Sequence, residues 1–547
     1  MTFPVYLAFG LSGILGMFFV SLVSTILNFF LPLTPDILLL ILLGGIVSAY
    51  AFRDQIIENL LLSDRITIFV CSAIVFFLIP WILWTNFGDT GLYHLPAMRW
   101  TLESPLPFGL ANLHGRFGFN SLWTPLISVI DGFTITLNVP IFLLNGIMTV
   151  FFCSIAIMRS IRIYKEHISL QFSDIFLLFS LFPTYIYGIK NINSASPDYA
   201  ILILSLLILY LYLYAYENQK FLKNIFIIAF LLGLFAFTIK LSGIILFLCT
   251  ICSLIYYSYR EGQFSIKNSS AGLFISTKKI VKTYYAPLLL ALLTIIILLI
   301  RGIILSGYAL YPLPWTGIRD LPWTVPLSFA QGDQNDVIAW ARNPGLDYKS
   351  SLQNWTWIPK WFAIFAKELC VPIGILLVAI VILFLYKFYF KSSFMKKEPF
   401  LHIISISTIG VIFWFLSAPD PRFGVGAIYG LCLGFMAWAI YHYITKGIPI
   451  QLNSSKCILI YHVLLIILVV VIYIIYCTQF RVGPPNPPLE FPQPDLDIKL
   501  THEGYIVYFP NGGEAWNSPL PNTPYFQKNI SFIYQEGGSL PRVILPA

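Results

Sequence analysis

The sequence predicts an all-α polytopic membrane protein of about thirteen transmembrane helices, with a small β-containing cap at its C-terminal end. Hydrophobic residues make up 58% of the 547 residues and charged residues only 11%, and the mean hydropathy is +0.80. A soluble domain carries about 25% charged residues, so most of this chain must be solvated by lipid. Apolar runs of about 20 residues, the length that a bilayer core requires, recur along the chain.

The predicted spans lie near residues 5–30, 34–52, 66–84, 138–158, 172–189, 198–216, 223–239, 241–258, 284–306, 368–386, 400–417, 423–444 and 457–478. Segment 117–134 is apolar as well, but it is short and contains Asn120 and Asp131.

The distribution of Lys and Arg decides whether segment 117–134 spans the membrane. If it does not span and the N-terminus is cytoplasmic, 18 of the 33 Lys and Arg residues fall in inside loops, as the positive-inside rule requires. If it did span, the later basic loops would all lie outside. We therefore predict a cytoplasmic N-terminus and an interfacial or re-entrant helix at 117–134.

This topology gives a membrane domain over residues 1–480, with two large outer loops at 85–137 and 307–367, and an extracytoplasmic domain over 481–547. The last segment opens with a Pro-rich run that favours extended chain. Residues 504–510 and 529–535 are typical of strands, and Asn511-Gly512-Gly513 of a turn. About 50 residues bury little core alone, so the cap is expected to pack on the membrane domain.

Charged residues beside membrane spans are costly and usually face a cavity or a partner. In the predicted topology most of them gather on the outer side. They are Asp89, Arg99, Glu103 and Arg116 in the first outer loop, Asp198, Lys240 and Arg301 at helix ends, Arg342 in the second loop, and Asp420 and Arg422 in a short turn. This distribution predicts one outward-opening cavity with several cations and a few carboxylates.

Each of these residues has a structural alternative. Asp89 and Asp198 are placed to cap helix N-termini. Lys240 and Arg301 are placed to extend toward the interface, and Arg422 to pair only with Asp420. His94 and His114 have the alternative of ordinary hydrogen bonding within the loop, in addition to a role at a site.

The chemistry that suits such a cavity is recognition of a lipid phosphate. Arg binds phosphate through bidentate geometry and Lys as a point charge, which makes Lys240, Arg301, Arg342 and Arg422 candidates for the phosphate of a donor. A carboxylate can act as general base toward a hydroxyl. A lipid-phosphate sugar needs both, because its phosphate is the leaving group and an activated hydroxyl attacks its anomeric carbon.

The segment Phe87–Pro96, with Arg99-Trp100 behind it, resembles the first outer loop of the GT-C superfamily of membrane glycosyltransferases. Other segments resemble a less characterised bacterial multi-pass family related to it. These are 194–198, 238–243, 301–312, 340–344, 418–423 and the tail element 514–521.

The resemblance implies a GT-C-like fold in a bacterial inner membrane, a polyprenyl-phosphate sugar donor, inversion at the anomeric carbon and an essential acid at Asp89. It leaves the second acid open between Glu103 and Asp198, and the acceptor open between a glycan, a lipid and a protein of the cell envelope. The expected substrate-loop residues are Tyr93, His94, Arg99, His114, Arg116 and Tyr311. Metal dependence varies across the superfamily, which leaves a divalent metal open as a cofactor, although no residue pattern in the chain forms a clear metal site.

Two other classes of function remain open. A polymerase or ligase of lipid-linked glycans would also have a cationic cavity and large outer loops, but it would depend on Arg and His rather than on one Asp. A non-enzymatic lipid or glycan transporter would show internal repeats, and the sequence has none. The net charge of +8 does not indicate a nucleic-acid partner, because the basic residues lie in short loops between spans.

Overall fold

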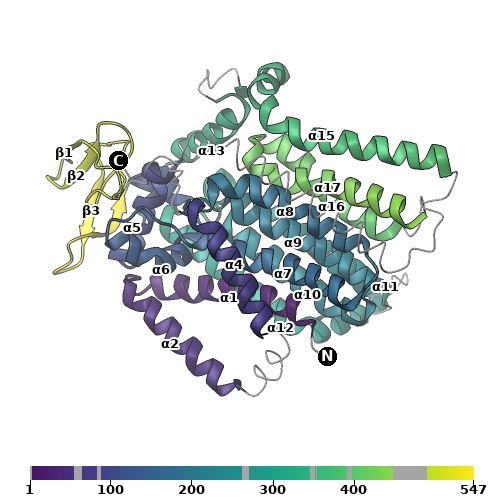
Figure 1. Ribbon diagram of the computed structural model, residues 1–547. Helices are drawn as coiled ribbons and strands as arrows, with labels where there is room; N and C mark the ends of the chain where they lie inside the picture. Colours follow the sequence, from purple (N-terminus) through teal and green to yellow (C-terminus); the bar gives the residue numbers. More distant parts are fainter. Residues whose placement is uncertain are drawn as a thin grey trace.

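The computed structural model describes residues 3–53, 64–82, 88–261, 270–344, 351–352, 354–390, 397–446 and 489–546. These residues form a bundle of long helices with a small β region at one end (Figure 1). The helices are α1 (Val5–Asn28), α2 (Pro35–Ala51), α4 (Asp64–Ile82), η1 (Thr90–His94), α5 (Leu95–Glu103), η2 (Leu110–Asn112), η3 (Gly115–Gly118), α6 (Trp123–Thr136), α7 (Leu144–Glu166), α8 (Phe172–Asn191), α9 (Asp198–Glu217), η4 (Gln219–Phe221), α10 (Leu222–Ile239), η5 (Leu241–Gly243), α11 (Ile244–Arg260), α12 (Ser270–Ser306), η6 (Pro314–Thr316), α13 (Leu327–Arg342), η7 (Trp355–Trp357), α15 (Ile358–Phe390), α16 (Lys397–Ser417) and α17 (Pro421–Lys446).

Within the described residues, nine helices are long and apolar enough to cross a membrane, which confirms a multi-pass α-helical membrane protein. Three other predicted spans, 34–52, 66–84 and 172–189, coincide with shorter apolar helices. The predicted span 457–478 lies outside the described residues.

Segment 117–134, which the charge distribution predicts not to span the membrane, corresponds mainly to α6, a helix of 14 residues. This is shorter than the roughly 20 residues that a bilayer core requires. It packs against α1 and α5, and its Asp131 is fully buried. In Figure 1, α5 and α6 lie beside the β region at the left-hand end of the bundle.

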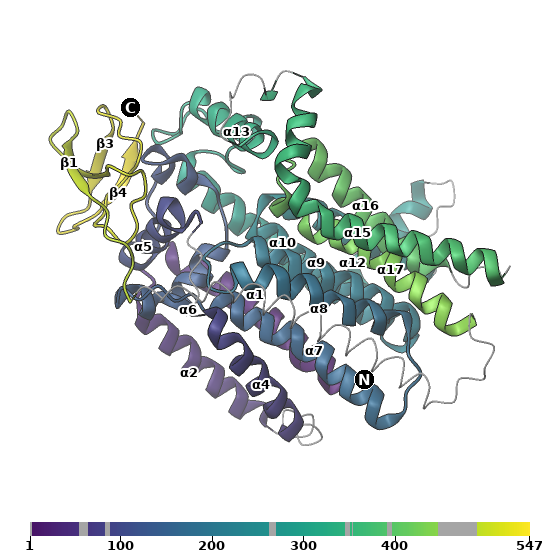
Figure 2. The same ribbon diagram turned by 45° about the horizontal axis from the view of Figure 1, so that its top comes forward.

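Helix α9 forms the centre of the bundle. Its sequence is apolar on all sides, as expected of a helix surrounded by other helices, and nearly every residue of it is buried. It contacts α7, α8, α10, α16 and α17, which surround it in Figure 2. The N-terminal end of α9, which carries Asp198, is therefore held in place from several sides.

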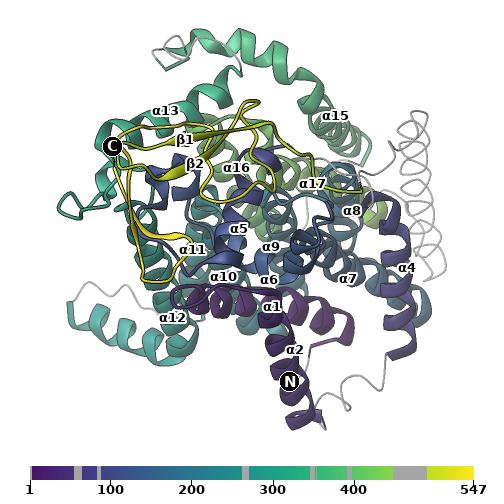
Figure 3. The same cartoon turned by 90° about the vertical axis from the view of Figure 1, so that its left-hand side faces the viewer.

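The cap consists of two antiparallel hairpins, β1 (Leu496–Leu500) with β2 (Ile506–Pro510) and β3 (Ser531–Tyr534) with β4 (Pro541–Leu545). Strands β2 and β3 coincide with the two strand-like runs in the sequence. Cap residues such as Val507 and Ile544 share one apolar core with Trp100 of α5 and Leu305 of α12. Figure 3 shows the cap in front of this end of the bundle.

Candidate functional site

The first outer loop begins with an unusual backbone. Gly88 has a φ of +43°, and residues Thr90–His94 then form a π-helical turn that runs directly into α5. In this turn the amide of His94 donates to the carbonyl of Asp89 at 3.5 Å. Such turns are rare and occur frequently at functional sites.

The side chain of Asp89 does not cap this turn. Instead, its Oδ2 accepts a hydrogen bond from the Tyr93 hydroxyl at 3.3 Å and lies 3.6 Å from Nη1 of Arg422. The Asp89 and Arg422 side chains are 42% and 41% exposed. An ion pair this exposed stabilises a fold by at most about 1 kcal/mol, so both groups remain accessible to a ligand.

Asp420, two residues before Arg422, holds the Arg422 side chain in the first turn of α17. Asp420 accepts from the Arg422 amide at 2.9 Å and from its Nε at 3.0 Å. Two indoles fix the preceding turn, because Trp361 donates to the carbonyl of Pro419 and Trp414 donates to the carbonyl of Asp420. The guanidinium thus binds Asp420 through Nε, while its Nη1 lies near Asp89.

Lys240 and Asp198 form a second ion pair beside the first. Lys240 ends α10 in extended conformation, and Asp198 lies in the first turn of α9 without capping it. The Lys240 ammonium is 3.8 Å from the ring centroid of Phe423, and the Arg422 guanidinium is 5.3 Å from the same centroid. One aromatic ring thus contacts both cations.

His94 lies among all of these charges. Burial is the largest cause that lowers the pKa of its imidazole; Asp89 and Asp198 raise this pKa, Lys240 and Arg422 lower it, and the net value is about 4. At neutral pH the ring is therefore uncharged. Burial first, and then the negative charge of Asp89, raise the pKa of the Tyr93 hydroxyl, so this hydroxyl remains a proton donor to the carboxylate.

We call Asp89, Asp198, Lys240, Asp420 and Arg422 the charged cluster. The structure therefore brings together the predicted base, one of the two candidate second acids and two of the four predicted phosphate-binding residues.

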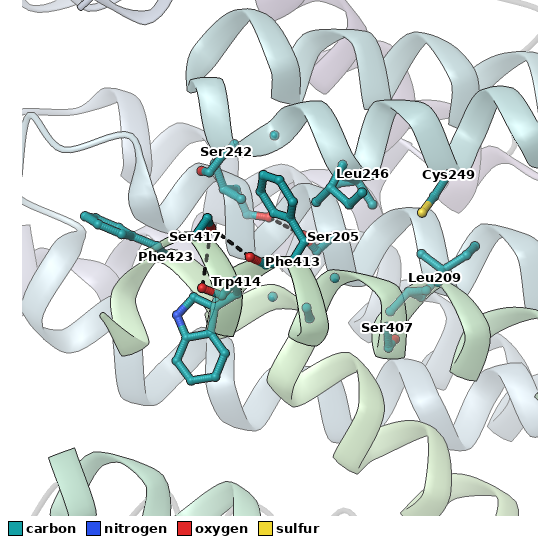
Figure 4. Close-up of a pocket in the computed structure, with 18 of the residues that line it drawn as sticks. Ser205, Leu209, Ser242, Leu246, Cys249, Ser407, Phe413, Trp414, Ser417 and Phe423 are labelled. Carbon is teal, nitrogen blue, oxygen red and sulfur yellow. Dashed lines mark hydrogen bonds between the residues drawn. The ribbon is translucent and has the colours of Figure 1, made fainter. Parts of the chain in front are cut away.

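A groove leads away from the charged cluster into the membrane helices. It is lined mostly by apolar side chains of α9, α11, α16 and α17. Phe423, which directly follows Arg422, and Ser242, two residues after Lys240, line one part of it. Leu209 and Cys249 line another part (Figure 4). Leu209 is about 16 Å along α9 from Asp198, at 1.5 Å per residue. We call this feature the apolar groove.

Other predicted site residues lie outside the cluster. Glu103, the other candidate second acid, pairs with Arg99, and Arg99 donates to the carbonyl of Asn517 in the cap at 2.7 Å. Arg342 donates to the carbonyl of Ser351 at 3.1 Å. Arg301 is 4% exposed, and it forms no ion pair in the part of the chain that the structure describes.

The remaining substrate-loop residues form a group between the first loop, the second loop and the cap. The His114 ring stacks on Tyr525 with centroids 5.2 Å apart, and burial, followed by Arg116, lowers its pKa to about 3. The Tyr311 hydroxyl donates to Oδ2 of Asp333 at 2.5 Å. Arg116 interacts electrostatically with Asp333 and with Tyr93, so this group adjoins Asp89.

Sequence reasoning missed two acids near the site. Glu368, on α15, interacts electrostatically with Asp420, Lys190 and Arg422, and Asp333 binds Tyr311. The only sequence signal for Glu368 is that it opens a predicted span at its outer end. The described residues contain no group of three or more His, Cys, Asp or Glu side chains arranged to hold a metal ion.

Comparison with known proteins gives one match. A family model described as a domain of unknown function (DUF8201) matches residues 7–429, which include the whole charged cluster and exclude the cap. Neither a curated protein nor a solved structure matches the chain.

Proposed function

The chain belongs to the DUF8201 family, and because that family's description names no activity, we propose from the geometry of the site that the protein is a membrane glycosyltransferase using a polyprenyl-phosphate sugar donor. The observation that carries this proposal is the junction of the apolar groove with the charged cluster. A ligand that fits this junction has a long apolar tail, an anionic head and a reactive group beside Asp89.

The groove supports a lipid-linked donor. Its walls are apolar helices within the candidate membrane spans, and it begins at Phe423, the ring that contacts both Lys240 and Arg422. A polyprenyl chain in the groove would place its phosphate at these two cations. Both are already partly neutralised by Asp198 and Asp420, which makes release of the lipid phosphate feasible after transfer.

Asp89 is the general base of the proposed reaction. Its exposed carboxylate takes the proton of the acceptor hydroxyl while the hydroxyl oxygen forms a bond to the anomeric carbon. The bond between that carbon and the phosphate oxygen breaks, and polyprenyl phosphate leaves with the electron pair. The charge that develops on the leaving oxygen is stabilised by Lys240 and Arg422. One displacement inverts the anomeric configuration.

The contacts of Glu103 and Asp198 suggest what each of these two candidate second acids does. Glu103 forms an ion pair with Arg99, and Asp198 forms one with Lys240. We assign Asp198 the role of orienting the Lys240 ammonium toward the phosphate, and Glu103 a role in attaching the cap.

The test is sugar transfer by the full-length protein in nanodiscs, with a radiolabelled polyprenyl-phosphate sugar as probe and release of polyprenyl phosphate as readout. General-base catalysis contributes about 10²- to 10⁴-fold, so Asp89→Asn is expected to reduce turnover by at least about 10²-fold. Asp497→Asn, a change of an exposed acid on β1, is the matched control. Unchanged turnover in Asp89→Asn would refute the assignment of the base.

We further propose that the charged cluster and the cap face the outside of a bacterial inner membrane. The support is the Lys and Arg bias, which puts the N-terminus in the cytoplasm. A cysteine introduced at exposed Asp497 should react with a membrane-impermeant maleimide in intact cells. Labelling only after cell lysis would place the cap in the cytoplasm.

A further inference from the structure

Polar and aromatic side chains meet directly beyond the far end of the apolar groove, the end away from the charged cluster. The groove residues at this end of α9, α11 and α16 are Leu209, Cys249 and Ile406, and Figure 4 shows Leu209 and Cys249 at the opposite end from Phe423. Tyr212, Ser253 and His402 lie three or four residues farther from the cluster on the same three helices. That spacing puts them on the next turn of the same helix faces.

The imidazole of His402 joins the three helices at this point. Its Nε2 is 2.8 Å from the Ser253 hydroxyl on α11, and its Nδ1 is 3.0 Å from the Tyr216 hydroxyl on α9. The ring stacks on Tyr212 with centroids 4.6 Å apart. Because the Ser253 hydroxyl already donates to the carbonyl of Cys249 at 2.8 Å, it accepts from Nε2, and Tyr216 donates to Nδ1. We call Tyr212, Tyr216, Ser253 and His402 the His402 junction.

Helices α11 and α16 are bonded to each other only beyond the groove in the part of the chain that the structure describes. Besides the Ser253–His402 bond, Glu398 of α16 accepts from the Tyr256 hydroxyl at 2.9 Å and from Arg260 at 2.8 Å. All three bonds lie on the far side of Cys249. Nearer the charged cluster, side chains of both helices line the groove instead.

The groove has lipid-facing side chains on both flanks. Leu248 and Ile409 directly precede the groove residues Cys249 and Gly410, and each of the two is 46% exposed. Both helices are candidate membrane spans, so these exposed faces contact lipid. A tail that reaches Cys249 therefore has a lateral route into the bilayer between α11 and α16.

The length of the groove places the His402 junction near the middle of the membrane. On α16 the groove extends from Ser417 to Ile406, which is about 16 Å at 1.5 Å per residue. The hydrocarbon core of a bilayer is about 30 Å thick. The groove therefore accompanies a lipid tail over about half of the core.

A hydrocarbon tail has no means of passing this junction without a large loss. It would have to displace the His402 ring and leave the hydroxyls of Ser253 and Tyr216 without their partner. Buried polar groups without partners are costly, and hydrocarbon offers no replacement hydrogen bond. The lateral route requires no such exchange.

We propose that the His402 junction is a stop that ends the tail site half-way through the membrane and directs the rest of a long tail sideways into the lipid. The protein then recognises the phosphate and the first isoprene units of its lipid, and longer tails gain no affinity. This inference rests on the proposed function, because it takes the occupant of the groove to be a prenyl tail.

Binding of lipid phosphates to the full-length protein in detergent micelles tests the stop. Farnesyl phosphate, whose extended tail is about as long as the groove, and undecaprenyl phosphate each compete with radiolabelled undecaprenyl phosphate. Concentrations are expressed as mole fractions in the micelle, so that partitioning does not bias the comparison. The wild type should bind the two lipids within about threefold of each other. A larger preference for undecaprenyl phosphate would show that the tail site continues past His402 and would overturn the stop.

His402→Ala removes the ring and opens the turn beyond Cys249. Since more apolar tail can then be buried, undecaprenyl phosphate should gain an advantage of roughly tenfold or more over farnesyl phosphate. Tyr216→Phe is the matched control, because it removes one bond to His402 but leaves the ring in place, and it should bind both lipids equally. Equal binding of both lipids by His402→Ala would also overturn the stop. The wild-type comparison requires no variant, so it decides the question if His402→Ala does not fold.

The stop and the proposed function fail in different ways. If the two lipids bind equally while Asp89→Asn leaves sugar transfer intact, the proposed reaction fails and the stop stands. If transfer depends on Asp89 but the wild type strongly prefers undecaprenyl phosphate, the stop alone fails. If the wild type binds neither lipid phosphate, both proposals fail.

Discussion

The indole of Trp516 occupies the space that a side chain on Gly91 would need. A Cβ on Gly91 would lie 2.5 Å from the indole ring, and the amide of Trp516 donates to the carbonyl of Gly91 at 3.0 Å. Trp516 itself has a φ of +47°, a left-handed conformation that is uncommon for a bulky residue. The cap thus touches the π-helical turn that directly follows Asp89, and both partners adopt rare backbone conformations at the contact.

Gly91→Ala is therefore expected to disturb this contact. The new Cβ would lie closer to the Trp516 indole than van der Waals contact allows. The hydrogen bond of the Trp516 amide fixes the position of the indole, so the π-helical turn or the cap must shift. Overpacking of this kind typically costs about 1–3 kcal/mol, which should appear as a lower melting temperature and faster proteolysis of the cap. Gly512→Ala is the matched control, because a Cβ there meets nothing within 4 Å. Equal melting temperatures of the two variants would show that the contact between Gly91 and Trp516 does not contribute to stability.

The apolar groove leads to a prediction about the length of the lipid. Cys249 lines the groove, whereas Cys252, three residues later on α11, is exposed. Cys249→Phe should fill the groove and raise KM roughly tenfold or more for a long polyprenyl donor, with a smaller effect on a donor with a short prenyl tail. Cys252→Phe should leave both values unchanged. An equal effect of Cys249→Phe on both donors would mean that the tail does not lie in the groove.

The membrane class and much of the charged cluster could be predicted from sequence, for a simple physical reason. Hydropathy identifies spans because lipid tolerates few polar groups, and Lys and Arg bias assigns the sides. Once the sides are assigned, Asp89, Asp198, Lys240 and Arg422 fall at the same ends of their helices. Their joint position then follows from topology and needs no knowledge of packing.

The positions of other residues depend on packing that hydropathy does not encode. Arg301 is buried near the end of α12, and in the described part of the chain it forms no ion pair with the charged cluster. Glu368 interacts electrostatically with Asp420 and Arg422 of the charged cluster because α15 packs on α17. The contact of Trp516 with Gly91 joins segments far apart in the sequence, and neither a π-helical turn nor a left-handed Trp has a reliable sequence signature.

Asp131 in α6 should make the protein less stable as the pH rises. The carboxyl is fully buried, its Oδ1 accepts from the Leu143 amide at 2.8 Å, and burial raises its pKa to about 7. The folded state therefore keeps a proton that the unfolded chain releases near pH 4. Its stabilising contribution is complete below pH 4 and is lost as the pH rises through 7, at roughly 1.4 kcal/mol per pKa unit.

Melting temperatures of wild type and Asp131→Asn between pH 5 and pH 8 measure this effect. The amide oxygen can still accept from Leu143 and carries no charge, so the variant should lose the decline that the wild type shows. A parallel decline in the two proteins would assign the pH dependence to other groups.

His94 should have the opposite effect. Burial lowers its pKa from 6.5 to about 4, so between these values the unfolded chain binds a proton that the folded state does not. Stability from this residue is present above pH 6.5 and is lost as the pH falls through 4, by roughly 1–3 kcal/mol. The charges facing it are Asp89 and Asp198, which oppose the shift, and Lys240 and Arg422, which add to it.

The measurement is the difference in melting temperature between wild type and His94→Gln from pH 7 to pH 4.5. The neutral amide cannot take up the proton, so the wild type should lose more stability than the variant over this range, while His502→Gln in the exposed part of the cap should follow the wild type. In Arg422→Met, which removes one of the cations, the pKa of His94 should rise and the acid loss should shrink. If Arg422→Met loses as much stability at low pH as the wild type, the charge of Arg422 does not affect the pKa of His94. The first outer loop would then pack less closely against α17 than the structure indicates.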